Sequence, residues 1–145
     1  MNLLDVSNLT VRYGEKTIVD DVNFAFSEGE WLMIVGPNGA GKSTIVNAIS
    51  QGTPYTGEAR LLGKDVRRYR PHELAKLVGV PAQTQAIGYG FTVGSVVRLG
   101  RYAYAPGLFS KGQTEDEAAV SRALELTGLT KIVDQNVLTL SGGEL

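Results

Sequence analysis

The feature that most constrains this chain is a continuous apolar run followed at once by a glycine-rich loop. The run is WLMIV, Trp31 to Val35, and the sequence continues GPNGAGKST over residues 36–44. A continuous apolar run of this length is typical of a strand buried on both faces, as in a parallel sheet. The next stretch, TIVNAIS, has helical character and ends at Gly52. This order of strand, loop and helix predicts an α/β fold.

The loop matches a phosphate-binding pattern in which glycine, lysine and a hydroxyl residue have fixed spacing. Gly36 and Gly41 frame four variable residues, and Lys42 and Ser43 follow directly. Glycine lets backbone N–H groups turn inward around an anion, and the next helix points the positive end of its dipole there. Lys42 would supply a cation for the β- and γ-phosphates, and the Ser43 hydroxyl would be a ligand for Mg²⁺. Because the motif lies between a strand and a helix, nucleotide binding is favoured over a plain glycine-rich turn.

The rest of the first half predicts short strands and turns. Residues 3–14 and 22–26 combine β-branched and aromatic residues with partial alternation, which is typical of strands. Turns are expected at Tyr13–Lys16 and Ser27–Glu30. The elements expected after the phosphate loop are a strand and turn over Gly57–Val66, a helix that begins at Pro71, and a short buried strand over Val78–Val80.

The second half predicts helices. Thr92 is the expected cap of a helix, and Thr114 and Glu117 have the spacing of a capping box that opens a longer helix through about Thr127. Gly128 is a natural C-terminal cap for that helix. The chain is therefore expected to have an antiparallel β portion at the front and a helical portion at the back.

Composition narrows the classes of function. A net charge of −1 provides no field for nucleic acid, so no nucleic-acid partner is expected. The absence of cysteine excludes disulfides and thiolate metal sites. No stretch contains the roughly 18 apolar residues that a membrane span requires. The one basic cluster, Arg67, Arg68 and Arg70, is interpreted as a solvated face.

Two motifs together resemble those of the ATP-binding cassette (ABC) ATPases: GPNGAGKST, and LSGGE at Leu140–Glu144. The resemblance covers the whole chain, and FTVGSVVRLGRYAY is similar to the importers of iron–siderophore, haem and vitamin B12-type substrates. It implies an incomplete P-loop NTPase (RecA-like) core, an N-terminal antiparallel β subdomain and part of the α-helical subdomain. The implied boundaries are 1–82 for the β subdomain and core, 83–91 for a linker, and 92–145 for the helical part.

The resemblance also implies ATP and Mg²⁺ as cofactors and assigns roles by position. Tyr13 matches the aromatic residue that stacks on adenine, for which a flat ring is suited. Ser141, Gly142 and Gly143 match the signature that reaches the γ-phosphate held by a second subunit in a head-to-tail dimer. The residues that match the phosphate loop itself are Gly36, Pro37, Asn38, Gly39, Ala40, Gly41, Lys42, Ser43 and Thr44.

A glutamine near the middle of the chain is a further candidate. Gln83 matches the family residue that contacts Mg²⁺ or the attacking water, so Lys42 and Gln83 are the candidate catalytic residues, and Ser43 and Gln83 the candidate metal ligands. The family usually has proline directly before this glutamine, whereas here the order is Val80-Pro81-Ala82-Gln83. Gln85 therefore remains an alternative.

Several family parts that follow the signature are missing from this sequence. They are the Walker B aspartate, the catalytic glutamate and the switch histidine; His72 lies well before the signature. The chain is expected to end just after the signature as an N-terminal fragment that binds nucleotide without hydrolysing it. Loss of further strands of the central sheet should expose apolar surface, which favours marginal stability or self-association.

The resemblance implies the ATP-binding subunit of an importer for an iron chelate, haem or cobalamin-type substrate. Its expected partners are an integral-membrane permease subunit and a second copy of the ATPase subunit. The expected location is cytoplasmic, at the inner face of the membrane through the permease. The alternative is a soluble ABC ATPase without a membrane partner, as in iron–sulfur assembly, translation or repair.

Overall fold

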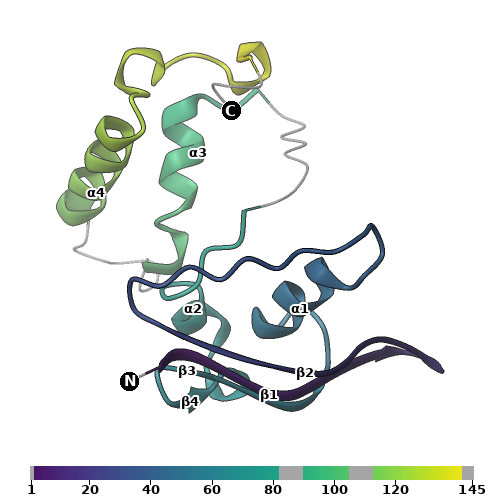
Figure 1. Ribbon diagram of the computed structural model, residues 1–145. Helices are drawn as coiled ribbons and strands as arrows, with labels where there is room; N and C mark the ends of the chain where they lie inside the picture. The colour runs from purple at the N-terminus through teal and green to yellow at the C-terminus, as the bar shows by residue number, and fades with distance from the viewer. Residues whose placement is uncertain (1, 82–89, 105–112, 142–145) are drawn as a thin grey trace. The chain divides into compact units, whose positions relative to one another are not determined.

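The computed structural model describes residues 2–81, 90–104 and 113–141, and the chain divides into two compact units (Figure 1). Unit 1 is Met1–Val80 and contains the sheet; unit 2 is Pro81–Leu145 and is helical. Within the described ranges, no helix has both the length and the apolar character needed to cross a membrane.

Unit 1 is built on a four-stranded antiparallel sheet with the order β2-β1-β3-β4. The strands are β1 (Asn2–Tyr13), β2 (Lys16–Ser27), β3 (Thr56–Leu61) and β4 (Lys64–Asp65). The expected turn between Tyr13 and Lys16 is confirmed, because these two residues are the last pair of the β1–β2 hairpin. The strand and turn expected over Gly57–Val66 are also confirmed, as β3 and β4.

The core of unit 1 lies between the sheet and helix α1 (Lys42–Ile49), which covers one face of the strands (Figure 1). Alternation along β1 sends Leu9 and Val11 to this face, and both are fully buried. Ile45 and Ala48 of α1 are buried in the same cluster. Burying one large apolar side chain is worth about 1.5–3 kcal/mol, so this layer fixes α1 against the sheet.

A short helix, α2 (Pro71–Leu74), follows the sheet. Pro71 is its first residue, as expected, because proline needs no hydrogen-bond acceptor for its nitrogen at this position. The Glu73 carboxylate accepts a hydrogen bond of 3.1 Å from the Arg70 N–H, which closes the first turn. Leu74 is buried and ties α2 to the core of unit 1.

Arg67 does more than form a solvated face. Its guanidinium donates to the Asp65 carboxylate at 2.6 Å and to the Gly57 carbonyl at 3.1 Å, and it lies over the Tyr55 ring. The hydrogen bond from Arg67 holds the pKa of Asp65 below its usual value. Arg67 therefore links the end of the sheet to the chain that precedes α2.

The buried strand expected over Trp31–Val35 is absent, and this prediction is wrong. These residues have no regular secondary structure, and Trp31 and Met33 are 99% and 83% exposed. The short strand expected over Val78–Val80 is absent as well. A buried parallel strand requires hydrogen-bonding neighbours, and no strand in the described part of the chain pairs with either segment. The apolar surface expected beside the phosphate loop is therefore present.

Unit 2 is held together by α3 (Val93–Leu99) and α4 (Gln113–Leu126), with short 3₁₀ turns at Tyr102–Tyr104, Thr130–Ile132 and Val137–Thr139. Its core consists of Val93, Val120, Leu124 and Val137. Two ion pairs support the packing of α3 and its C-terminal extension on α4: Arg98 with Glu117 at 3.1 Å, and Arg101 with Asp116 at 2.7 Å.

Two caps of these helices agree with the sequence-based expectations. The Thr92 hydroxyl accepts from the Ser95 N–H at 3.2 Å, so the cap of α3 is confirmed. Gly128 has a φ of +71°, and the Leu129 N–H donates to the Leu124 carbonyl, so the C-terminal cap of α4 is confirmed as well. The helix expected through about Thr127 is confirmed as α4, which ends at Leu126, and the capping role of the Thr114 side chain lies outside what the structure describes.

The exposed apolar segment leads to a test with the single tryptophan of the chain. Trp31 is 99% exposed, so at low protein concentration its fluorescence should match that of tryptophan in water and be fully open to acrylamide quenching. Unfolding in urea should then leave the emission maximum unchanged. A blue-shifted emission in dilute protein that moves to the red in urea would contradict the fold described here.

Candidate functional site

The phosphate loop connects the extended Trp31–Val35 segment to α1. Within it, the Ala40 N–H donates to the Pro37 carbonyl at 3.2 Å and closes a turn. The Ile45 N–H donates to the Gly41 carbonyl at 3.0 Å, which is the first hydrogen bond of the helix. The loop therefore runs directly into α1, so the unpaired N–H groups of the first helical turn lie next to it.

Gly41 fixes the end of the loop on the sheet. Its φ is +87°, in the left-handed region that favours glycine. A Cβ at this position would lie 2.9 Å from the Ile18 carbonyl oxygen and 2.9 Å from Cγ2 of Val19 on β2. By contrast, Gly39 has a similar φ of +84°, but a Cβ added there would have no atom within 4 Å. Gly41 is therefore the point of contact between the loop and the β1–β2 hairpin.

Lys42 turns back over the loop. Its Nζ donates to the carbonyl oxygens of Gly36 and Pro37, both at 2.8 Å. These acceptors are neutral, and none of the ion pairs within the described residues includes Lys42. Among the described residues, only carbonyl dipoles thus hold the ammonium group beside the loop, where its charge can attract an anion.

The hydroxyl residues of the motif lie in the first turn of α1. Ser43 is exposed and Thr44 is half-buried. The first turn contains no acidic residue, so no carboxylate there opposes an anion. In residues 2–81, 90–104 and 113–141, no group of three or more histidine, cysteine, aspartate or glutamate side chains is placed to hold a metal. The Ser43 oxygen fits the preference of Mg²⁺ for hard oxygen ligands completed by water and phosphate.

Tyr13 is the last residue of β1 and is 54% exposed. Its hydroxyl lies 3.3 Å from Oγ1 of Thr53, which is 8% exposed. Thr53 is not among the residues that the sequence predicts for the site. The two residues are 40 positions apart and Thr53 belongs to no motif, so no local signal could have identified the contact.

Of the predicted signature, the structure describes only its first part. Ser141 is exposed and follows the 3₁₀ turn Val137–Thr139. Asn136 caps this turn, because its Oδ1 accepts from the Leu138 N–H at 2.9 Å. Gly142 and Gly143 lie outside the described residues, as do Gln83 and its alternative Gln85.

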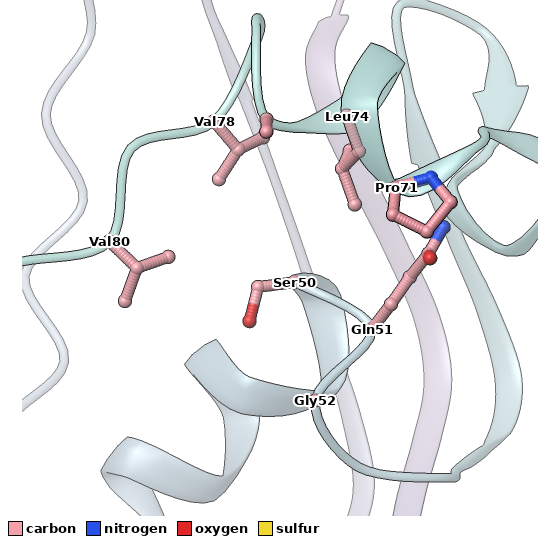
Figure 2. A pocket seen from close by; sticks show the side chains of 8 residues that line it. Ser50, Gln51, Gly52, Pro71, Leu74, Val78 and Val80 are labelled. Atoms are coloured by element: carbon pink, nitrogen blue, oxygen red, sulfur yellow. The ribbon is translucent and has the colours of Figure 1, made fainter. Parts of the chain in front are cut away.

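One cavity of about 380 Å³ lies between the C-terminal end of α1 and α2. Figure 2 shows its lining, in which Leu74, Val78 and Val80 are apolar and Ser50 contributes a hydroxyl. The cavity has no charged lining residue and lies at the opposite end of α1 from Lys42. It is therefore separate from the phosphate loop.

Comparison with known proteins places this geometry in a family. A model of the ABC transporter family matches residues 19–145. The ferric enterobactin transport ATP-binding protein FepC of Escherichia coli (strain K12) is 39% identical over 137 residues, which are 94% of this chain and 50% of FepC. The hemin import ATP-binding protein HmuV of Rhizobium etli is 39% identical over 142 residues, which are 98% of this chain and 52% of HmuV.

A solved structure shows the same fold. The crystal structure of a nucleotide-free ATP-binding cassette from an ABC transporter matches with a TM-score of 0.79 at 28% identity. The match covers 99% of this chain and 61% of the solved one. The chain spans about half the length of the curated relatives that it matches. The phosphate loop, the fold and the sequence comparison all indicate the same family. The chain belongs to the ABC transporter family and has the fold of its ATP-binding domain.

Proposed function

We propose that this chain binds ATP with Mg²⁺ at its phosphate loop, as the ATP-binding part of an importer. The observation that carries the proposal is the position of Lys42, whose ammonium is held by the carbonyls of Gly36 and Pro37 at the start of α1. A cation held only by neutral acceptors can exchange them for phosphate oxygens, which form stronger, charge-assisted hydrogen bonds.

Each residue of the loop has a distinct role in this proposal. Backbone N–H groups between Gly36 and Thr44 surround the phosphates, and Lys42 contacts the β- and γ-phosphates. The Ser43 hydroxyl would hold Mg²⁺, which supplies neutralisation of the phosphate charge when bound. Tyr13 offers its exposed ring to the adenine base.

The remaining predicted residues complete the site in the assembled protein. We propose that Ser141, Gly142 and Gly143 contact the γ-phosphate on a second copy of the subunit, and that Gln83, or alternatively Gln85, acts on Mg²⁺ or the attacking water. The 145-residue chain by itself is expected to bind ATP without hydrolysing it, because its sequence contains no Walker B aspartate, catalytic glutamate or switch histidine motif.

The names of the relatives support a class of substrate. One relative is a ferric enterobactin transport protein and another a hemin import protein. We propose import of an iron chelate, haem or a cobalamin-type compound, driven through an integral-membrane permease that holds the subunit at the cytoplasmic face. Co-purification with an integral-membrane protein would distinguish this function from that of a soluble ABC ATPase.

The role of Lys42 can be tested by replacing it. Lys42→Ala should weaken MgATP binding at least about tenfold, because it removes charged hydrogen bonds worth about 1.5–3 kcal/mol. Isothermal titration calorimetry on the 145-residue chain measures the change. Lys131→Ala is the matched control, since it removes an equal charge from unit 2 and should leave the affinity unchanged. Equal affinities for both variants would refute the proposed site.

The anchoring of the loop can be tested with two glycines of nearly equal φ. Alanine is strained at both Gly39 and Gly41, but only at Gly41 does its Cβ also meet the backbone and Val19 of β2. Gly41→Ala should therefore cost about 1–3 kcal/mol more stability than Gly39→Ala. Thermal unfolding of the nucleotide-free variants provides the comparison. Equal losses would show that the loop does not depend on its contact with β2.

A further inference from the structure

The buried residue Thr53 forms a hydrogen bond with Tyr13, the exposed aromatic residue of the candidate site. Among the residues that the structure describes, Thr53 is the one buried polar side chain, with 8% of its surface exposed. Its hydroxyl lies 3.3 Å from the hydroxyl of Tyr13, which is 54% exposed. The tip of the Tyr13 ring is therefore fixed from the protein interior while much of the residue stays open to solvent.

Thr53 is itself rigidly placed relative to the phosphate loop. It follows α1, the helix that begins at Lys42. The Gly52 N–H donates to the Asn47 carbonyl at 2.7 Å, which fixes the chain directly before Thr53. The Gln51 side-chain amide donates to the Tyr69 carbonyl at 3.1 Å and ties the same turn to the segment before α2. One helix thus connects the lysine of the phosphate loop with the anchor of Tyr13.

We propose that Thr53 is a positioning residue for the base of the bound nucleotide: its hydroxyl sets the orientation of the Tyr13 ring on which the base stacks. The inference rests on the proposed function and names a residue that no motif contains. A ring oriented before binding loses less rotational freedom when the base arrives. Without the Thr53 hydroxyl, the Tyr13 ring still offers the same stacking surface to the base. Its rotational freedom is then lost only when the nucleotide binds, which lowers the affinity.

Two substitutions remove the same hydrogen bond from opposite sides. Thr53→Val keeps the shape of the buried side chain, and Tyr13→Phe keeps the aromatic ring. Thr53→Ser restores the hydroxyl. The probes are MgATP, which contains a base, and magnesium tripolyphosphate, which does not, with each affinity measured by calorimetry on the 145-residue chain.

Thr53→Val should weaken MgATP binding about two- to tenfold, the range that corresponds to ordering one side chain. Tyr13→Phe should cause the same loss, the double variant no further loss, and Thr53→Ser should recover most of the affinity. The affinity for tripolyphosphate should be unchanged in all four variants, because the phosphate loop does not contain this hydrogen bond.

Three results would overturn the inference. They are an unchanged MgATP affinity in Thr53→Val, equal losses for MgATP and tripolyphosphate, or additive losses in the double variant. If Thr53→Val does not fold, Tyr13→Phe decides alone, because Tyr13 is half-exposed at a strand end. A different result would refute the proposed function itself: the unmodified chain would bind neither MgATP nor magnesium tripolyphosphate. If the unmodified chain binds both probes and Thr53→Val has no effect on MgATP affinity, only the role of Thr53 is refuted.

Discussion

The antiparallel pairing of β1 with β2 on one side and β3 on the other is the constraint on which the candidate site depends. It places Tyr13 at the end of the hairpin and brings Ile18 and Val19 of β2 against Gly41. The buried face of the same sheet fixes α1, which begins at Lys42. Both ends of the proposed nucleotide site are therefore set by one hairpin and one helix.

The positive charge of Lys42 makes the loop suitable for binding an anion. Lys42 is restrained by two carbonyls, which lowers its freedom without cancelling its charge. The carboxylates of unit 1 whose pKa is lowered lie elsewhere: the hydrogen bond from Arg67 lowers the pKa of Asp65, and the hydrogen bond from the Arg70 N–H lowers that of Glu73. The Asp65–Arg67 ion pair thus stabilises the sheet and the Glu73 hydrogen bond stabilises α2, while no described ion pair includes Lys42 of the phosphate loop.

Local chemistry could be predicted from the sequence, and long-range pairing could not. The Thr92 and Gly128 caps, Pro71 at the start of α2 and the hairpin turn each depend on residues a few positions apart. The apolar run Trp31–Val35 predicted a buried strand, but burial also requires neighbouring strands, and the described sheet provides none. The contact between Tyr13 and Thr53 spans 40 positions, so only the fold reveals it.

A crystal structure of this chain with MgATP would show whether Lys42 and its loop receive the phosphates of the nucleotide. We expect Lys42 Nζ to exchange its contacts with the Gly36 and Pro37 carbonyls, now 2.8 Å each, for β- and γ-phosphate oxygens, and the Ser43 hydroxyl to be a ligand of Mg²⁺. Nucleotide bound away from residues 36–44, or Lys42 with both carbonyl contacts intact beside bound ATP, would contradict the proposed site.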